Sequence, residues 1–149
     1  MTPPRRRKYG ITMDIGGDQI ISVSLVLTLL LLSRVRDLLD NSGLFAASIT
    51  GLTVSLMGHW TWLIALFSFL VVGSIATKWK IEEKKLLSLE EANEGLRSWK
   101  NVLANGGAVS IIAIYNFISP GEEWIYFAAI ASISVALSDT LASEIGSLD

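Results

Sequence analysis

Two acidic residues near the C-terminus are the first candidates for chemistry. Asp139 and Glu144 follow the 15-residue run 124–138, which carries no charged side chain. A carboxylate beside hydrocarbon costs roughly a few kcal/mol, so it is expected to face protein, water or a cation. Four small residues share the helical face of Asp139: Ser132, Ala136, Ser143 and Gly146. Such a face lets a helix or a ligand approach the backbone closely. The alternative is a span that ends at Ser138 and leaves both acids solvated.

A second candidate site lies in the run RSWKNVLANGG, which begins at Arg97. Here Asn105 is predicted as a helix N-cap or loop residue, and no side chain obstructs the amides of Gly106 and Gly107. A helix start with free N–H groups binds anions, and Arg97 and Lys100 would add positive charge. The alternative has two parts: the cations extend to the membrane interface as ordinary snorkelling residues, and the glycines allow close helix packing.

The composition indicates a membrane protein. Hydrophobic residues make up 51% of the 149 residues and charged residues only 17%, against about 25% in soluble domains. Disordered chains are polar, so this class is excluded. A net charge of −2 gives no global basic surface for nucleic acid. The absence of cysteine and the single histidine exclude thiolate chemistry and a multi-histidine metal site.

Charge-free segments define the expected elements. The run 41–77 holds 37 residues without Lys, Arg, Asp or Glu, enough for two spans of about 18 residues broken at Gly58-His59. All five tryptophans lie within a few residues of a segment end, which is typical of a membrane interface. We therefore predict an all-α, polytopic membrane helix bundle that forms one integral membrane domain over 1–149. Its five hydrophobic segments are 19–33, 43–57, 60–77, 101–119 and 124–146.

The hydrophilic stretch 78–100 is expected to form a loop with a short amphipathic helix. With five alternating spans, one side carries eight Lys and Arg residues, including this loop, and the other carries four. The hydrophobic segments place the protein in the cell membrane, and the positive-inside bias places the loop in the cytosol. The basic N-terminal run then lies outside, against that bias. A start at Met13 or a re-entrant 43–57 segment would remove the conflict, and both keep the loop cytosolic.

Three stretches together carry a family resemblance. They are LDNSGLFAA at 39–47, RSWKNVLANGG at 97–107 and SDTLASEIG at 138–146. The patterns VLANGG and DTxASEIG, in this order and about 30 residues apart, are specific. The chain resembles the transmembrane-protein-19 family of integral membrane proteins, which includes the plant phytyl-phosphate kinase, over roughly residues 20–146.

The resemblance implies phosphoryl transfer from a nucleoside triphosphate, ATP or CTP, to an isoprenoid monophosphate. The spacing of Asp139, Ala142 and Gly146 is also similar to motifs of membrane polyprenol kinases and CDP-lipid synthases, in which the Asp contacts metal and nucleotide phosphate. Mg²⁺ takes oxygen ligands, so Asp139 and Glu144 are the implied catalytic and metal-binding residues. On a straight helix these two lie about 140° apart and do not share a face. The implied phosphate-binding residues are Arg97, Lys100, Asn105, Gly106 and Gly107.

Other functions stay open at this point. A CTP-dependent lipid kinase or cytidylyltransferase would share a site centred on Asp139. A small transporter or assembly subunit would use Asp139 as a proton or cation ligand, without nucleotide. The expected partners are an isoprenoid lipid phosphate and membrane lipids, and no nucleic acid. Members of the family are longer, so the chain is expected to be an N-terminal part whose further partner is a missing C-terminal half or a second copy.

Overall fold

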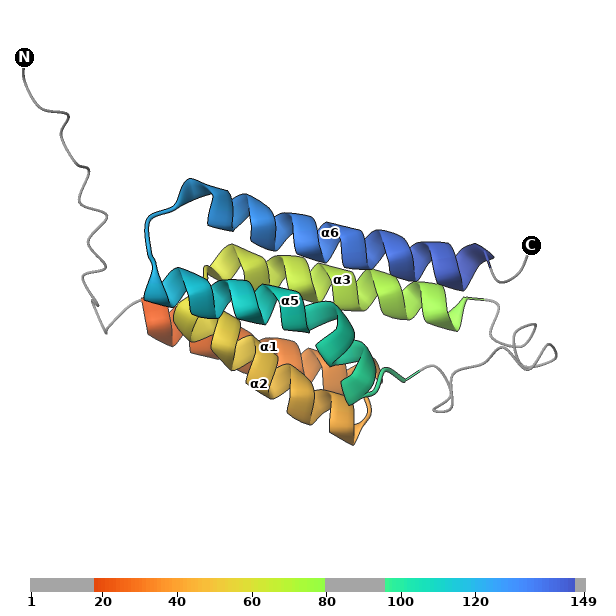
Figure 1. Ribbon diagram of the computed structural model, residues 1–149. Coiled ribbons are helices and arrows are strands. Elements are labelled where there is room, and N and C mark those ends of the chain that lie inside the picture. The colour runs from red at the N-terminus through yellow and green to blue at the C-terminus, as the bar shows by residue number, and fades with distance from the viewer. Residues whose placement is uncertain (1–17, 80–95, 147–149) are drawn as a thin grey trace, which may run out of the picture.

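A computed structural model describes residues 18–79 and 96–146. In this part of the chain there are five helices and no strand (Figure 1). The helices are α1 (Asp18–Val35), α2 (Asn41–Met57), α3 (Trp60–Lys78), α5 (Trp99–Ile118) and α6 (Glu123–Gly146). The prediction of an all-α helix bundle is confirmed. The amphipathic helix expected within 78–100 falls mainly on residues 80–95, outside the described residues.

The break between α2 and α3 lies at the predicted Gly58-His59 pair. Gly58 ends α2, and a Cβ at this position would lie 2.6 Å from a ring carbon of Trp62, so only glycine fits. His59 caps α3, because its Nδ1 accepts a hydrogen bond from the amide of Thr61 at 3.3 Å. A small residue followed by a capping side chain therefore reverses the chain within two residues. α2 is one continuous helix, with its two ends at opposite ends of the bundle.

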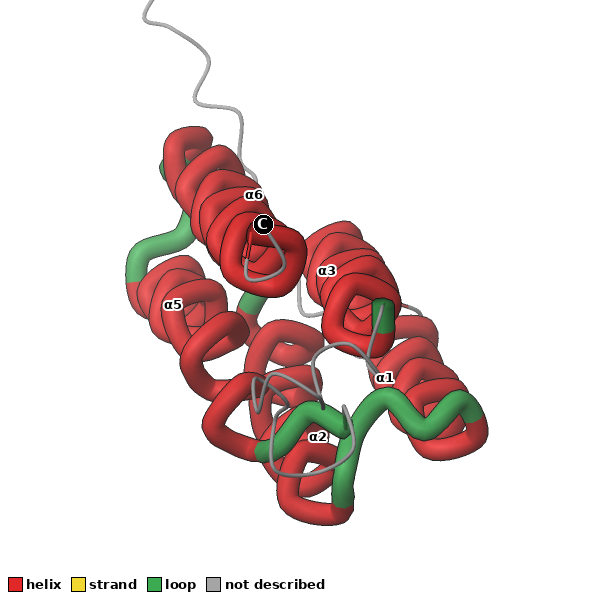
Figure 2. Tube along the Cα trace, turned by 90° about the vertical axis from the view of Figure 1, so that its right-hand side faces the viewer, coloured by secondary structure: helices red, strands yellow, loops and turns green. Residues whose placement is uncertain are grey.

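The helices run alternately up and down, so five helix ends meet at one end of the bundle. This end, here called the motif end, comprises residues 34–42, 77–79, 96–100 and 144–146. It lies at the right of Figure 1 and faces the viewer in Figure 2. Five cationic residues belong to it, together with three acidic ones: Arg34, Arg36, Lys78, Arg97 and Lys100, and Asp37, Asp40 and Glu144. The opposite end, at 57–60 and 118–123, carries Glu122 and Glu123. Charge is therefore divided unequally along the bundle axis.

α2 and α5 pack most extensively, the pairs α3–α6, α1–α2 and α5–α6 pack to a similar, smaller extent, and α2 and α3 touch only sparsely. Small residues allow α2 and α5 to approach, since a Cβ on Gly106 would lie 2.9 Å from the Thr50 methyl. The core between the helices is apolar and includes Val54, Trp62 and Val109. A cavity, described below, remains beside α1 where α2 and α3 separate.

The outer surface of the bundle is also apolar. Residues such as Ile111, Ile118 and Phe127 expose about 70% of their surface. α3, α5 and α6 are long and apolar enough to cross a membrane, whereas α1 and α2 are shorter. Helices satisfy their own backbone hydrogen bonds, which is what a hydrocarbon environment requires. The exposed apolar faces are thus suited to contact with lipid.

Candidate functional site

The backbone of Arg97 joins the second motif stretch to the first. Its N–H donates to the carbonyl oxygen of Leu38 at 3.1 Å, and its own carbonyl accepts from the amide of Asp40 at 3.1 Å. These two bonds form a short parallel bridge between Leu39 and Arg97, the only one in the described part of the chain. Residues 58 positions apart in the sequence are thereby held side by side at the motif end.

The start of α2 completes this junction. Asp40 is the N-cap, and its Oδ1 accepts from the amide of Gly43 and the hydroxyl of Ser42, both at 2.7 Å. The Ser42 oxygen in turn accepts from the amide of Trp99 at 3.2 Å. Gly43 lies directly against the Arg97 carbonyl oxygen, which occupies the place of a side chain. Ser42 therefore links the capping residue of α2 to the first turn of α5.

These capping residues were not singled out as functional in the sequence. In the sequence they appear only as part of the first motif stretch, 39–47. The available signal was the pattern Asp40-x-Ser42-Gly43, since Asp is a preferred N-cap residue. The pattern identifies the start of α2, although not the contact with Trp99.

The side chain of Arg97 points into the bundle, and the residue is only 4% exposed. Its guanidinium carbon lies 5.3 Å from the centre of the Phe69 ring, a cation–π arrangement. Nη2 donates to the hydroxyl of Thr77 at a long 3.4 Å. A Cβ on Gly73 would lie 2.7 Å from Nη2, so α3 is hollowed to receive the guanidinium. Arg97 thus anchors the segment before α5 to α3.

Thr77 extends this anchor to α6. Its hydroxyl lies 2.8 Å from Oε1 of Glu144 and 3.0 Å from the carbonyl oxygen of Gly73. The hydroxyl has one proton for these two acceptors, of which the carboxylate is the nearer, while its oxygen accepts from Arg97. We call Arg97, Thr77 and Glu144 the polar relay. It connects three elements, and with them the second and third motif stretches.

Asp139 lies apart from the polar relay. Its side chain is exposed on α6, whereas Glu144 is partly buried and turned toward α3. Among the described residues no group of three or more His, Cys, Asp or Glu is placed to hold a metal ion. Asp139 and Glu144 lie about 140° apart around α6, as expected for residues five positions apart on a straight helix. Asp139 remains available as a single carboxylate ligand.

The predicted anion site around Asn105 is not formed in the way we expected. α5 begins at Trp99 with Ser98 as its N-cap, so the expectation that Asn105 caps a helix is wrong. Its side-chain nitrogen donates to the Asn101 carbonyl at 2.7 Å. The amides of Gly106 and Gly107 lie inside the helix, where backbone carbonyls four residues earlier use them. Gly106 instead allows α5 to pack on Thr50.

Two lysines remain at the surface of the motif end. Lys100 is exposed in the first turn of α5. Lys78 ends α3, and its Nζ donates to the carbonyl oxygen of Asp37 at 2.7 Å. Asp37 adopts a left-handed backbone conformation, with φ 49°, in the turn after α1. Lys100 is therefore the predicted phosphate-binding residue that is directly accessible.

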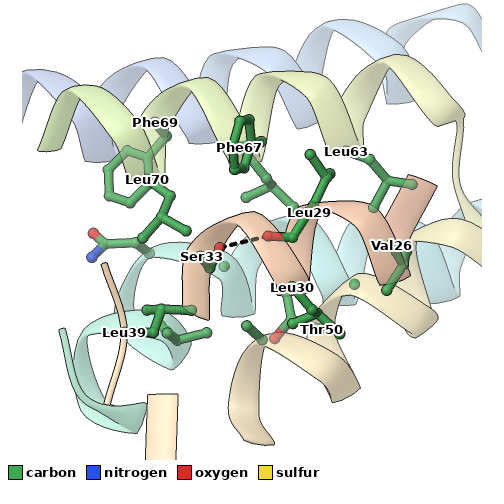
Figure 3. A pocket seen from close by; sticks show the side chains of 16 residues that line it. Val26, Leu29, Leu30, Ser33, Leu39, Thr50, Leu63, Phe67, Phe69 and Leu70 are labelled. Carbon is green, nitrogen blue, oxygen red and sulfur yellow. Dashed lines mark hydrogen bonds between the residues drawn. The ribbon is translucent and has the colours of Figure 1, made fainter. Parts of the chain in front are cut away.

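An apolar cavity of about 100 Å³ lies between α1, α2, α3 and α5 (Figure 3). Its walls include Val26 and Leu30 of α1 and Leu63 and Leu70 of α3. Phe69, which carries the Arg97 guanidinium, also lines it. The cavity is thus next to the residues that organise the motif end.

Comparisons with known proteins agree with an integral membrane protein. The family described as "Integral membrane protein DUF92" matches residues 24–149. An uncharacterized membrane protein of Methanocaldococcus jannaschii is 34% identical over 128 residues, 86% of this chain and 52% of the relative. An uncharacterized membrane protein of Synechocystis is 29% identical over 113 residues, 74% of this chain and 44% of the relative. The chain spans about half the length of these relatives, and no solved structure matches it. The chain therefore belongs to the DUF92 family of integral membrane proteins.

Proposed function

We propose that this membrane protein, or the longer protein it corresponds to in its relatives, is a Mg²⁺-dependent kinase. It would transfer a nucleotide phosphate to an isoprenoid monophosphate, as the resemblance to the phytyl-phosphate kinase family implies. The observation that carries the proposal is the meeting of three motif stretches at one end of the bundle, through the Arg97 bridge and the polar relay. Stretches that are far apart in sequence would share one site there.

Asp139 is the residue we assign to the metal–nucleotide complex. Mg²⁺ in such sites takes one or two carboxylates, with phosphate oxygens and water completing its shell. One exposed carboxylate meets that requirement, and Glu144, about 140° away around the helix and bonded to Thr77, is assigned to the polar relay instead. The bound ion would neutralise charge on the transferring phosphate. Lys100, exposed at the same end of the bundle, would add positive charge for the phosphates.

The polar relay has a different role in this proposal. The buried guanidinium of Arg97 is engaged with Phe69 and Thr77, so it acts as a positioning residue in this conformation. It fixes the start of α5, which carries Lys100, relative to α6, which carries Asp139. Removal of a partner from such a buried network leaves another polar group poorly satisfied. Changes in the polar relay should therefore alter both stability and phosphate affinity.

The transfer itself needs no basic side chain. The second pKa of a phosphate monoester is about 6, so the acceptor is largely a dianion at neutral pH. One of its oxygens would attack the γ-phosphorus and form a new O–P bond. The bond from the γ-phosphorus to the bridging oxygen breaks, and the nucleoside diphosphate leaves with the electron pair. Positioning and charge neutralisation supply most of the catalysis in such reactions.

The basic motif end is placed in the cytosol in this proposal, where nucleotide is present. All five cationic residues named above lie there, and the acidic pair 122–123 lies at the other end. The positive-inside bias supports this orientation.

The test is phosphate transfer by purified protein in detergent. The assay would contain Mg²⁺, labelled ATP or CTP, and phytyl, farnesyl or geranylgeranyl monophosphate, with the corresponding alcohols as acceptor controls. We expect labelled diphosphate from a monophosphate, and at least a hundredfold loss of transfer in Asp139→Asn. The matched variant Glu122→Gln, at the opposite end, should retain activity within twofold. The chain and a full-length relative would be assayed together.

Other outcomes separate the competing functions. Release of pyrophosphate with a nucleotide-linked lipid would identify a cytidylyltransferase. If neither protein transferred phosphate, or if Asp139→Asn transferred it normally, the kinase proposal would be wrong.

A further inference from the structure

The cavity between α1, α2, α3 and α5 is lined almost entirely by carbon. Its polar members are few, and two of them are already satisfied within their own helices. The Ser33 hydroxyl donates to the Leu29 carbonyl at 2.7 Å (Figure 3), and the Asn105 amide donates to Asn101. A buried water needs two to four polar partners, which these walls do not offer. The cavity is therefore suited to an apolar occupant.

Size and shape limit what that occupant can be. The volume of about 100 Å³ is somewhat below the roughly 150 Å³ of a cavity that takes up benzene. The wall from Leu63 to Leu70 is seven helical steps of α3 long, or about 10 Å along the axis by helical rise. A short stretch of one hydrocarbon chain, aligned with the bundle, fits these dimensions. Packing atoms into such a space restores dispersion contacts that an empty cavity lacks.

One end of the cavity approaches the basic motif end. Phe69 lies in the wall and carries the Arg97 guanidinium on its ring. Leu39, another wall residue, is the partner of Arg97 in the backbone bridge. Val102 in the wall lies two residues after the exposed Lys100 in α5, about 3 Å along the axis and on a different side of the helix. A chain in the cavity would therefore have its head group near positive charge, which favours an anionic head.

We infer that this cavity binds the part of an isoprenoid chain nearest to its phosphate, with the anionic head at the motif end. The identification of the ligand as an isoprenoid rests on the proposed function. The apolar cavity and its position beside the basic end are independent of that function. A larger side chain introduced on α2 at Ala47 or Gly51, which both line the cavity, would occupy its space. Gly51 already lies close to α1, because a Cβ there would be 3.3 Å from a Val26 methyl carbon. Ala47 is the better position for a filling substitution.

The experiment is photolabelling without nucleotide. The probe is farnesyl monophosphate with a diazirine on the first isoprene unit, added to the full chain in detergent, and labelled peptides are mapped by mass spectrometry. We expect label on cavity residues of α1, α2, α3 and α5. Ala47→Phe should reduce that label at least tenfold. Ala108→Phe, the same change at an exposed position of α5, should leave it within twofold.

A second variant tests whether a loss of label comes from misfolding rather than from a filled cavity. Ala47→Leu adds less volume and should reduce label about threefold to tenfold, with a thermal unfolding midpoint close to that of the parent chain. Unlabelled farnesyl monophosphate should compete at lower concentration than farnesol, because only the former carries the anionic head. Label confined to the outer helix faces, or equal label in the Ala47 and Ala108 variants, would overturn the inference.

The outcome is separable from that of the kinase assay. Cavity labelling that Ala47→Phe abolishes, without any phosphate transfer, would support the cavity inference and count against the proposed kinase. If a folded Ala47→Leu protein showed unchanged phosphate transfer and unchanged labelling, the kinase proposal would stand and the cavity inference would be overturned.

Discussion

Gly43 and Arg97 lie in direct contact: the carbonyl oxygen of Arg97 occupies the space that a side chain at position 43 would need. The same oxygen accepts a hydrogen bond from the amide of Asp40, which lies three residues before Gly43. The first turn of α2 therefore contacts the backbone of the segment that precedes α5 and fixes its position. Because α2 and α5 also pack closely along their length, this contact sets where that packing begins.

Gly43→Ala should destabilise the protein despite the better helix propensity of alanine. The new methyl group meets a backbone atom that is held by two hydrogen bonds, so relief requires movement of the chain. We expect the free energy of unfolding to fall by about 1–3 kcal/mol, the usual cost of overpacking. Thermal unfolding in detergent would measure the change.

Gly107→Ala is the matched control. It lies in α5, and nothing comes within 4 Å of an added Cβ. Alanine should therefore stabilise this helix by about 0.5–1 kcal/mol through its propensity alone. Equal effects of the two substitutions would contradict the contact between Gly43 and Arg97.

Thr77→Val tests the polar relay. Valine keeps the branched shape but removes the hydroxyl that lies 2.8 Å from Glu144 and 3.4 Å from Arg97. Loss of a buried hydrogen-bond partner costs about 1–3 kcal/mol. Thr53→Val in α2 is the control, since its exposed hydroxyl bonds only the Ile49 carbonyl of its own helix. We expect less than about 0.5 kcal/mol there, and similar losses at both sites would argue against a relay.

Asp40→Ala should remove the cap of α2. Its carboxylate accepts from Gly43 and Ser42, and loss of such a cap costs about 0.5–2 kcal/mol. The companion variant is Ser98→Ala, because Ser98 precedes α5 without a side-chain capping bond. It should change stability by only a few tenths of a kcal/mol. A larger loss at Ser98 than at Asp40 in thermal unfolding would reverse our assignment of the caps.

The helix bundle was predictable because membrane helices leave long gaps in the charge pattern. The 37-residue gap and the Gly58-His59 pair placed the α2–α3 break correctly. The start of α5 was less predictable. Asn105, Gly106 and Gly107 have the local composition of a helix start, but Gly106 packs on Thr50 of α2 and the helix continues through all three. A contact with a distant helix outweighs the local preference.

The site was predictable only as a set of residues, not as an arrangement. The sequence indicates Arg97 as a cation for phosphate, and the structure buries it over Phe69 and against Gly73. That burial depends on a hollow in α3, 24 residues earlier in the sequence, which no local pattern reports. The separation of Asp139 from Glu144, in contrast, follows from helical geometry alone. Local periodicity therefore predicts faces of single helices, and tertiary packing decides which faces meet.

The orientation of the bundle can be tested directly, because the chain has no cysteine to interfere. Lys100→Cys lies at the basic motif end and Glu122→Cys at the opposite end, and both positions are exposed. In intact cells a membrane-impermeant maleimide should label only Glu122→Cys, since the positive-inside bias places the motif end in the cytosol. Inverted membrane vesicles should give the opposite pattern, and detergent should make both sites react. Labelling of Lys100→Cys in intact cells would place the motif end outside. Cytosolic nucleotide could then not reach Asp139, and the proposed kinase would have to be abandoned.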